Sequence, residues 1–297
     1  MDIVVDLGQS GARVKIGDEV FKLPIPKKTN ETVIETLEEI FKTLTQSEFE
    51  EVFLSLTGLL GDVGQVDPYG EICHRYFKAK RVYVMDDGLA AYFGALAEGN
   101  GVVLTLGGGV VAVSGNKGKF GHADGKGQIF GDFGGGFWLG QFGLRRAIAT
   151  IDGRDDAHDL VEALQDELVV HSKLENKTSL EAAALCIASA KRVIEAAETN
   201  SRSALQILDI GASELSKTVI AAWLKVRESN QEVPELAFLG GLSQSKLYVD
   251  LIARQVQQKL NCKVTSAKGD HLAGAPIAAR LYPEGRPPLM KCWKQVS

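Results

Sequence analysis

A glycine-rich stretch with one isolated carboxylate is the part of this 297-residue sequence best suited to chemistry. Residues 101–140 hold 14 of the 32 glycines, and Asp132 stands between two glycine clusters. Glycine loses more backbone entropy on folding than other residues, so this density indicates turns or a close backbone approach to a ligand. A strand, a glycine turn, a carboxylate and a helix that starts near Phe137 together predict a small-molecule site. The alternative is a glycine-rich hairpin and linker without chemistry.

Three strand-to-glycine turns could bind an anion. They lie at Asp6–Ser10, Leu106–Gly109 and Leu239–Ser243. Backbone N–H groups in such turns, and at the starts of helices, favour phosphate without help from a lysine. The sequence contains neither the GxxxxGK[ST] motif of P-loop proteins nor the GxGxxG motif of dinucleotide-binding folds. The three turns, taken in this order, therefore predict an anion site of another class.

The composition excludes several classes of protein. The formal net charge is −5 without a basic block, so nucleic acid is not expected as the main partner. No run approaches the ~18 uncharged apolar residues of a membrane span, and the opening MDIVVDLG lacks the basic region of a signal peptide. The cysteines form no CxxC or Cys/His motif, which favours reduced thiols in a cytoplasmic protein over a zinc site or disulfides. These scattered cysteines are Cys73, Cys186, Cys262 and Cys292.

The elements that must position these residues come in two similar series. The first opens with three strands, from Ile3 to about Leu23, followed by a helix over Thr29–Leu44 that Asn30 could cap. Two short strands then alternate with two helices; the four segments are Phe53–Leu56, Asp67–Phe77, Val82–Met85 and Leu89–Ala97. From Gly101 the order of strand, glycine turn and strand restarts, with a loop-like third segment. This repetition predicts a duplicated α/β domain with a cleft between the copies.

Helices dominate the later part of the sequence. The region from Asp155 to about Asn230 carries long apolar stripes, which are typical of a core or of a dimer surface. A strand, a helix, a short strand and a second helix are expected to follow, at Glu235–Leu239, Lys246–Leu260, Lys263–Thr265 and His271–Leu281. The tail from Glu284 to Ser297 is expected to be irregular.

A series of motifs in this order resembles a known family. The motifs are DLGQSG, LSLTGLLG, VMDDGLAAYFGAL, LTLGGGVVAVSG, GQIFGDFGGGFWLG, AFLGGLSQSKLY and HLAGAPIAAR. From Asp2 to about Leu281, the chain resembles the BadF/BadG/BcrA/BcrD-type ATPase family, which includes N-acetylglucosamine and glucosamine kinases. This family belongs to the actin, sugar kinase and Hsp70 superfamily. The resemblance implies an α/β fold of two ribonuclease H-like (actin-like ATPase) lobes with a cleft between them.

The same resemblance implies where the lobes divide. An N-terminal lobe would span residues 1–98, and a C-terminal lobe would span residues 99–281. The second lobe would carry a helical insertion at about 155–230, and residues 282–297 would pack back on the first lobe. The family also implies a homodimer, formed through the helical region.

Roles for individual residues are implied by their positions in the family motifs. Asp87 falls where the family's catalytic base contacts and activates the acceptor hydroxyl, in front of an alanine-rich helix. Asp132, with Gly131 before it, falls in the turn that contacts sugar hydroxyls, and Asp6 falls at the acid that works with magnesium through water. The implied ATP-binding residues lie in two phosphate loops and an adenosine motif; they are Gly8, Gln9, Ser10, Gly107, Gly108, Gly109, Gly240, Gly241, Ser243 and Ser245.

Each of the three carboxylates also has a purely structural interpretation. Asp87 and Asp132 could cap the helices that follow them, and Asp6 could simply be a turn residue. The chain also departs from the family, because its second phosphate loop has lost both hydroxyls of GTGS and Lys126 replaces an expected tryptophan. Each lost hydroxyl removes a hydrogen bond of roughly 0.5–1.5 kcal/mol, whereas backbone N–H contacts remain available.

Three functions follow from the resemblance. The first is an ATP-dependent kinase that transfers the γ-phosphate of Mg-ATP to a hydroxyl of N-acetylglucosamine, glucosamine or a related amino sugar. The second is an ATPase that activates a partner protein, which the absence of suitably paired cysteines near the glycine motifs disfavours. The third is a nucleotide-binding regulator that has lost catalysis. Fold alone does not choose among these functions.

Overall fold

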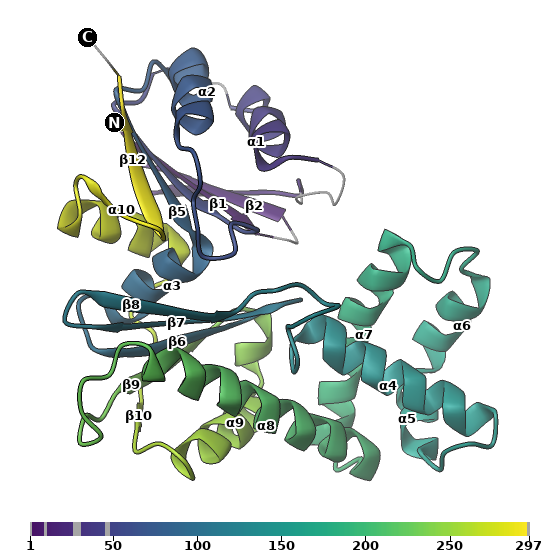
Figure 1. The fold of residues 1–297 in the computed structure, drawn as a ribbon. Helices are drawn as coiled ribbons and strands as arrows, with labels where there is room; N and C mark the ends of the chain where they lie inside the picture. The colour runs from purple at the N-terminus through teal and green to yellow at the C-terminus, as the bar shows by residue number, and fades with distance from the viewer. Residues whose placement is uncertain (1, 9–10, 26–30, 45–47, 296–297) are drawn as a thin grey trace. The chain divides into compact units, whose positions relative to one another are not determined.

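The computed structural model describes residues 2–8, 11–25, 31–44 and 48–295. The chain forms two compact units (Figure 1). Unit 1 consists of residues 1–103 and 266–297, and unit 2 consists of residues 104–265. Within the described ranges, no helix combines the length and the apolar character needed to cross a membrane.

A seven-stranded sheet forms the centre of unit 1. Its strands follow the order β11-β12-β5-β4-β1-β2-β3, in which β1, β4 and β5 are mutually parallel. Their bounds are β1 Asp2–Gly8, β2 Gly11–Ile16, β3 Glu19–Leu23, β4 Glu51–Leu56, β5 Arg81–Asp86, β11 Gly285–Arg286 and β12 Met290–Lys294. Leu7 of β1 pairs with Leu56 of β4, which pairs in turn with Asp86 of β5. The parallel strands therefore end at one edge of the sheet, where ligand sites of open α/β sheets usually lie.

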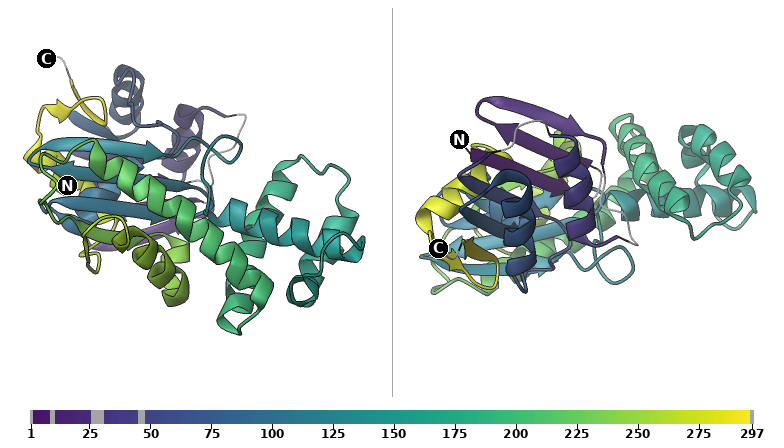
Figure 2. Two further views of the ribbon diagram at one scale, coloured as in Figure 1. Left: turned by 60° about the horizontal axis from the view of Figure 1, so that its bottom comes forward. Right: turned by 90° about the horizontal axis from the view of Figure 1, so that it is seen from above.

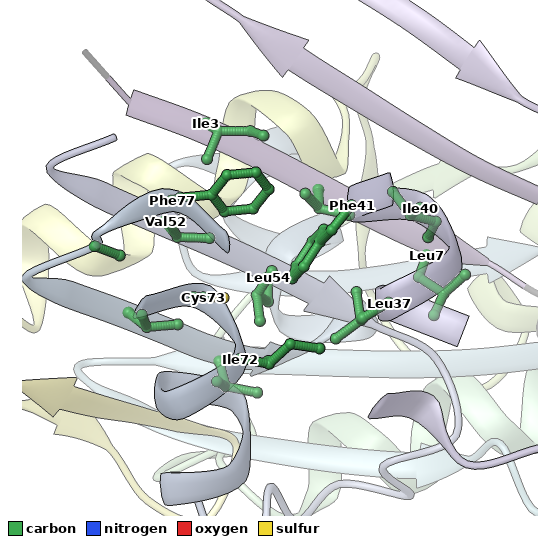
Figure 3. Packing of buried hydrophobic residues seen from close by; sticks show 14 of the residues in the cluster. Ile3, Leu7, Leu37, Ile40, Phe41, Val52, Leu54, Ile72, Cys73 and Phe77 are labelled. Carbon is green, nitrogen blue, oxygen red and sulfur yellow. The ribbon is translucent and has the colours of Figure 1, made fainter. Parts of the chain in front are cut away.

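One face of this sheet carries the main core of unit 1. Ile3, Val5 and Leu7 of β1 alternate toward helices α1 (Val33–Lys42) and α2 (Asp67–Phe77). Figure 3 shows Ile3 and Leu7 in one cluster with Leu37, Ile40 and Phe41 of α1 and with Ile72, Cys73 and Phe77 of α2. The spacing of two along the strand and of three to four along each helix brings these apolar faces together. The core fixes the strand ends that carry the polar residues described below.

Helix α1 begins with a reciprocal capping box. The Thr32 hydroxyl accepts a hydrogen bond from the Glu35 N–H at 3.2 Å, and the Glu35 carboxylate accepts one from the Thr32 N–H at 2.7 Å. We expect Thr32→Ala to destabilise unit 1 by about 1 kcal/mol, because the Glu35 N–H loses its acceptor. Urea unfolding followed by circular dichroism measures this loss. Thr32→Ser keeps the hydroxyl and is the control; an equal loss in both variants would contradict the capping role.

Helices α3 (Asp87–Leu96) and α10 (His271–Leu281) cover the other face of the sheet (Figure 1). They approach so closely that a Cβ atom on Gly274 would lie 1.8 Å from the Ala90 carbonyl oxygen. A Cβ atom on Gly94 would lie 2.0 Å from the carbonyl oxygen of Asp270. Two glycines thus allow backbone contact between helices that are far apart in the sequence. Because α3 begins at Asp87, this contact also fixes the position of that carboxylate.

Unit 2 contains a five-stranded sheet in the order β10-β9-β6-β7-β8. The strand bounds are β6 Gly101–Leu106, β7 Val110–Asn116, β8 Lys119–Asp124, β9 Glu235–Leu239 and β10 Lys263–Val264. Helix α8 (Arg202–Leu224) runs along this sheet beside α9 (Lys246–Gln257), as Figure 2 shows. The Ser114 hydroxyl of β7 donates a hydrogen bond of 2.7 Å to the Ala222 carbonyl of α8, which joins the two layers.

The remaining helices of unit 2 gather beyond the end of its sheet (Figures 1 and 2). They are α4 Gly136–Ile151, α5 His158–Ala163, α6 Gln165–Lys173 and α7 Leu180–Glu198. Helix α4 packs against α7 at Gly140, where a Cβ atom would lie 1.7 Å from the Cys186 carbonyl oxygen. The apolar stripe of α7 is therefore largely core, since Leu185, Val193 and Ile194 are buried.

Several expectations from the sequence need correction. Residues 266–281 were expected in the C-terminal lobe, but they belong to unit 1 because α10 packs on α3. The tail is not irregular: it forms β11 and β12, and β12 pairs with β5. The segment after β7 is strand β8 rather than a loop. Asn30 lies outside the described residues, and Thr32 is the cap of α1.

Candidate active site

Two adjacent aspartates, Asp86 and Asp87, have different roles at the start of α3. Asp86 is the N-cap, and its carboxylate accepts hydrogen bonds of 3.0 Å from the Gly88 N–H and from the Gly61 N–H. Asp87 is the first residue of the helix, so it is not the cap. The Thr57 side chain and the Gly88 N–H lie near its carboxylate. The capping interpretation thus applies to Asp86 and leaves Asp87 without that structural task.

The surroundings of Asp87 make its carboxyl group unusually basic. Burial away from water raises the pKa of Asp87 well above its ordinary value of 3.8, and the nearby carboxylates of Asp86 and Asp6 raise it further. Hydrogen bonds from Thr57 and Gly88 act in the opposite direction. Raised carboxyl pKa values are typical of groups that exchange protons with a substrate.

Asp6 lies near the end of β1 as part of an ionic network. Its Oδ1 accepts a hydrogen bond of 3.0 Å from the Ser55 hydroxyl, and its Oδ2 accepts one of 3.0 Å from Arg13 Nε. Arg13 stands opposite Asp6 in the β1–β2 pair and also forms an ion pair with Asp270, the N-cap of α10. Asp6 is therefore a strand residue, not a turn residue, and both of its oxygens are engaged.

In unit 2, three glycine-containing segments are in contact with one another. The first N–H groups of α4, from Gly136 and Phe137, donate to the carbonyls of Gly107 and Gly108 at 2.8 and 2.9 Å. Gly240 lies against the end of β6, where a Cβ atom would be 2.3 Å from the Leu106 carbonyl oxygen. Its φ of +93° is a second reason for glycine at this position. The predicted second phosphate loop and the predicted adenosine motif are therefore in contact.

Asp132 lies in the turn before α4 and is almost fully buried, with 3% of its surface exposed. Its N–H donates a 2.8 Å hydrogen bond to Asp124, and its carboxylate lies against Gly109, where a Cβ atom would be 2.6 Å from Oδ2. The N-cap of α4 is Gly135, so Asp132 is not a helix cap. Its Oδ1 is buried and has no hydrogen-bond partner among the described residues. A buried carboxylate oxygen without a partner is costly, and a bound hydroxyl would satisfy it.

Asp132→Asn is expected to remove a pH-dependent loss of stability. Burial, reinforced by the charge of Asp124, raises the pKa of Asp132 from 3.8 to about 6, although the Val110 N–H lowers it. The folded state therefore binds this proton more tightly than the unfolded state, so stability falls as pH rises between about 4 and 6. The neutral variant should melt above the wild type near neutral pH and lose that advantage at about pH 4.

Thermal unfolding at several pH values tests this expectation. Asp2→Asn removes the same charge at the exposed start of β1 and is the control. If Asp2→Asn shows the same pH-dependent gain in melting temperature, the effect comes from net charge rather than from the buried carboxylate.

The structure groups the predicted site residues within their own units. Unit 1 carries Asp6, Gly8 and Asp87, whereas Gln9 and Ser10 lie outside the described residues. Unit 2 brings together Gly107–Gly109, Gly131 with Asp132, and the segment Gly240–Ser245. In this last segment the Ser243 hydroxyl donates to the Gly240 carbonyl at 2.7 Å, Gly241 has open space beside it, and Ser245 caps α9.

Four residues of these networks were missed from the sequence. Asp86 could have been found, because two adjacent aspartates at the start of a helix provide a cap as well as a second carboxylate. Ser55 and Thr57 occupy alternate positions on one face of β4 and its extension. This pattern indicates part of a site only when the order of the strands in the sheet is known. The predicted hairpin could have placed Arg13 opposite Asp6, but its contact with Asp270, 257 residues away, had no signal in the sequence.

The two units define the class of fold: each is a ribonuclease H-like lobe of the actin-like ATPase and sugar kinase type. A family model for the BadF/BadG/BcrA/BcrD ATPase family matches residues 3–275. The chain belongs to this family. A search of curated proteins finds no significant sequence match.

Solved structures with this fold are distant in sequence. A protein from Chromobacterium violaceum, assigned as an N-acetylglucosamine kinase, is 20% identical over 92% of this chain and 96% of its own, with a TM-score of 0.67. One from Porphyromonas gingivalis with the same assignment is 12% identical over 93% and 99% of the two chains, with a TM-score of 0.66. A ROK family glucokinase from Streptomyces griseus, in complex with glucose and AMPPNP, is 18% identical over 96% and 99%, with a TM-score of 0.61.

Proposed function

We propose that this protein is an ATP-dependent sugar kinase that phosphorylates a hydroxyl of N-acetylglucosamine, glucosamine or a related amino sugar. The observation that carries the proposal is that the two aspartates at the start of α3 have different roles. Asp86 caps the helix, and Asp87 keeps a carboxylate of raised pKa at the edge where the parallel strands end. Such a group can orient an acceptor hydroxyl and accept its proton as phosphate is transferred.

Asp132 supports a hydroxyl-bearing acceptor. Its buried Oδ1 has no hydrogen-bond partner among the described residues, and a carboxylate accepts sugar hydroxyls in a fixed geometry. The names given to the structurally similar proteins from C. violaceum and P. gingivalis point to an amino sugar. We therefore place acceptor binding at Asp132, with Gly131 before it, and proton acceptance at Asp87.

The proposed nucleotide contacts are mainly backbone groups. Gly8, with Gln9 and Ser10 after it, would form the first phosphate loop, and Gly107–Gly109 would form the second. Gly240–Ser245 would hold the adenosine. Backbone N–H groups in glycine turns suit phosphate even though this chain lacks the family's hydroxyls in the second loop.

The donor set at Asp6 fits a hydrated magnesium ion. Both carboxylate oxygens already accept hydrogen bonds, from Ser55 and Arg13, so Asp6 would hold the ion through water. Among the described residues, no group of three or more His, Cys, Asp or Glu side chains could hold a metal alone. Magnesium commonly takes most of its ligands from nucleotide phosphates and water, and when bound it would neutralise phosphate charge.

ADP release from Mg-ATP tests the proposal, with N-acetylglucosamine, glucosamine, N-acetylmannosamine, glucose and no acceptor as separate arms. A kinase shows turnover that one sugar stimulates and that Asp87→Asn abolishes. Equal turnover without any acceptor would instead indicate an ATPase that activates a partner. Measurable ATP binding without turnover in any arm would indicate a nucleotide-binding regulator.

A further inference from the structure

Tyr248 connects two segments of the proposed site in unit 2. It is the third residue of α9 and is completely buried. Its hydroxyl donates a hydrogen bond of 2.8 Å to the Gly134 carbonyl, in the turn that carries Asp132. Burial raises the pKa of Tyr248, so the hydroxyl keeps its proton and remains a donor.

Two glycines make room for this hydrogen bond. A Cβ atom on Gly211 of α8 would lie 2.5 Å from the Tyr248 hydroxyl oxygen. Gly134 has a φ of +86°, and a Cβ atom there would lie 2.8 Å from the Gly211 carbonyl oxygen and 2.7 Å from Leu215 Cγ. A side chain on Gly211 would therefore fill the space of the hydroxyl, and one on Gly134 would collide with α8.

One end of the connection reaches Asp132. The N–H of Gly135, immediately after Gly134, donates to the Asp132 carbonyl at 3.0 Å, and the N–H of Gly136 donates to the Gly107 carbonyl at 2.8 Å. Gly134 thus lies inside a turn that is hydrogen-bonded to Asp132 and to the second phosphate loop. A shift of Gly134 would move the Asp132 carboxylate relative to Gly109.

The other end reaches the predicted adenosine segment. The Ser245 hydroxyl caps α9 by accepting the Tyr248 N–H at 3.4 Å, and it donates to Glu198 at 2.8 Å. Ser245 directly follows the Gly241–Gln244 turn, which starts beside Gly240 and the end of β6. Tyr248 is therefore attached by its backbone to the nucleotide segment and by its hydroxyl to the acceptor segment.

We infer that Tyr248 is a positioning residue that holds the turn of Asp132 in the geometry needed for the acceptor. The role of Asp132 in binding an acceptor rests on the proposed function. The hydrogen bond between Tyr248 and Gly134 does not, and it lies wholly within unit 2. Tyr248 touches neither reacting group, so its removal should affect acceptor binding more than chemistry or nucleotide binding.

Tyr248→Phe tests the inference, because it removes one oxygen and keeps the ring in the core. In the ADP-release assay, we expect the acceptor KM to rise about fivefold to tenfold, the loss expected for one buried hydrogen bond. The KM for ATP should stay within about twofold of the wild type. Tyr83→Phe is the matched control: the Tyr83 hydroxyl of β5 also donates to a carbonyl, that of Pro283, but in unit 1. It should leave both KM values unchanged.

A second readout needs no substrate. In protein labelled with ¹³C at aspartate carboxyls, Asp132→Asn identifies the Asp132 signal, whose pKa is about 6 in the wild type. A loosened turn admits water, so Tyr248→Phe should lower this pKa toward 3.8, while the neighbouring Asp124 carboxylate and Val110 N–H stay in place. Tyr83→Phe should leave it unchanged.

The two readouts separate this inference from the proposed function. A lowered Asp132 pKa without sugar turnover, even in the wild type, would refute the kinase and retain the positioning role. An unchanged pKa with an unchanged KM ratio in folded Tyr248→Phe would overturn the positioning role. Equal rises in both KM values would likewise overturn it, since they would indicate a general structural effect.

Discussion

Asp87→Asn should lower kcat by about 10³-fold, which is the range expected when a general base is removed. Asparagine keeps the shape of the side chain and stays near Thr57 and Gly88. It cannot take up the proton of an acceptor hydroxyl. Binding of ATP should change little, because Asp87 is not among the proposed nucleotide contacts. Steady-state ADP release and ATP titration calorimetry measure the two quantities.

Protein stability should move in the opposite direction from activity in this variant. The raised pKa of Asp87 means that its ionised form is less favourable in the folded state, so stability falls as pH rises through the interval above 3.8. Asp87→Asn removes that cost and should melt at or above the wild-type temperature at neutral pH. Loss of activity through unfolding would produce the reverse, a lower melting temperature, and would remove the support for a catalytic role.

Asp86→Asn provides the pH-dependent control. Its neighbouring charge is one cause of the raised Asp87 pKa, after burial itself. Neutralising it should move the acidic limb of the kcat/KM profile to lower pH, because Asp87 then loses its proton more easily. A limb that moves to higher pH, or does not move, would contradict Asp87 as the base.

Among the described glycines of unit 1, Gly274 should be the one whose replacement with alanine lowers stability most. Its Cβ atom would lie 1.8 Å from the Ala90 carbonyl oxygen and 2.4 Å from the Gly94 nitrogen, and both are backbone atoms that cannot rotate away. Helix α10 must therefore move away from α3. We expect a loss on the order of 3 kcal/mol, at the upper end of overpacking effects, in urea unfolding of unit 1. Kinase activity should fall as well, since α3 positions Asp87.

The control for this prediction is Gly241→Ala, where an added Cβ atom meets nothing within 4 Å. The same chemical change should shift stability there by no more than about 0.5 kcal/mol. If both variants lose the same free energy of unfolding, the overlap between α3 and α10 adds no cost of its own, and the prediction is wrong.

Much of the fold could be predicted because local patterns agree with it. The apolar run of Ile3, Val4 and Val5 marks β1, and the helix at His271–Leu281 has the bounds expected from the sequence. The tail was mistaken because Met290–Lys294 is a short segment with two lysines, and it becomes a strand only beside β5. Pairing with a distant strand supplies hydrogen bonds that no local pattern reveals.

The candidate site shows the same limit. The glycine-rich stretch drew attention to Asp132, and the resemblance to the family drew attention to Asp87; among the described residues, these are the two carboxyl groups whose pKa is raised. The contacts that adjust them come from elsewhere in the chain. Tyr248 reaches the turn of Asp132 across 114 residues, and Arg13 joins Asp6 to Asp270. Such pairs depend on tertiary structure, so residue types and spacing alone do not predict them.

The discontinuity of unit 1 has a consequence for synthesis on the ribosome. Unit 2 is one uninterrupted segment, residues 104–265, and all of its strands except the first residues of β6 are made within it. Unit 1 needs α10 and β12, which are made after the whole of unit 2. The sheet of unit 1 therefore remains incomplete, with β5 unpaired on one side, while unit 2 emerges and folds. The lobe that begins first along the chain is completed last.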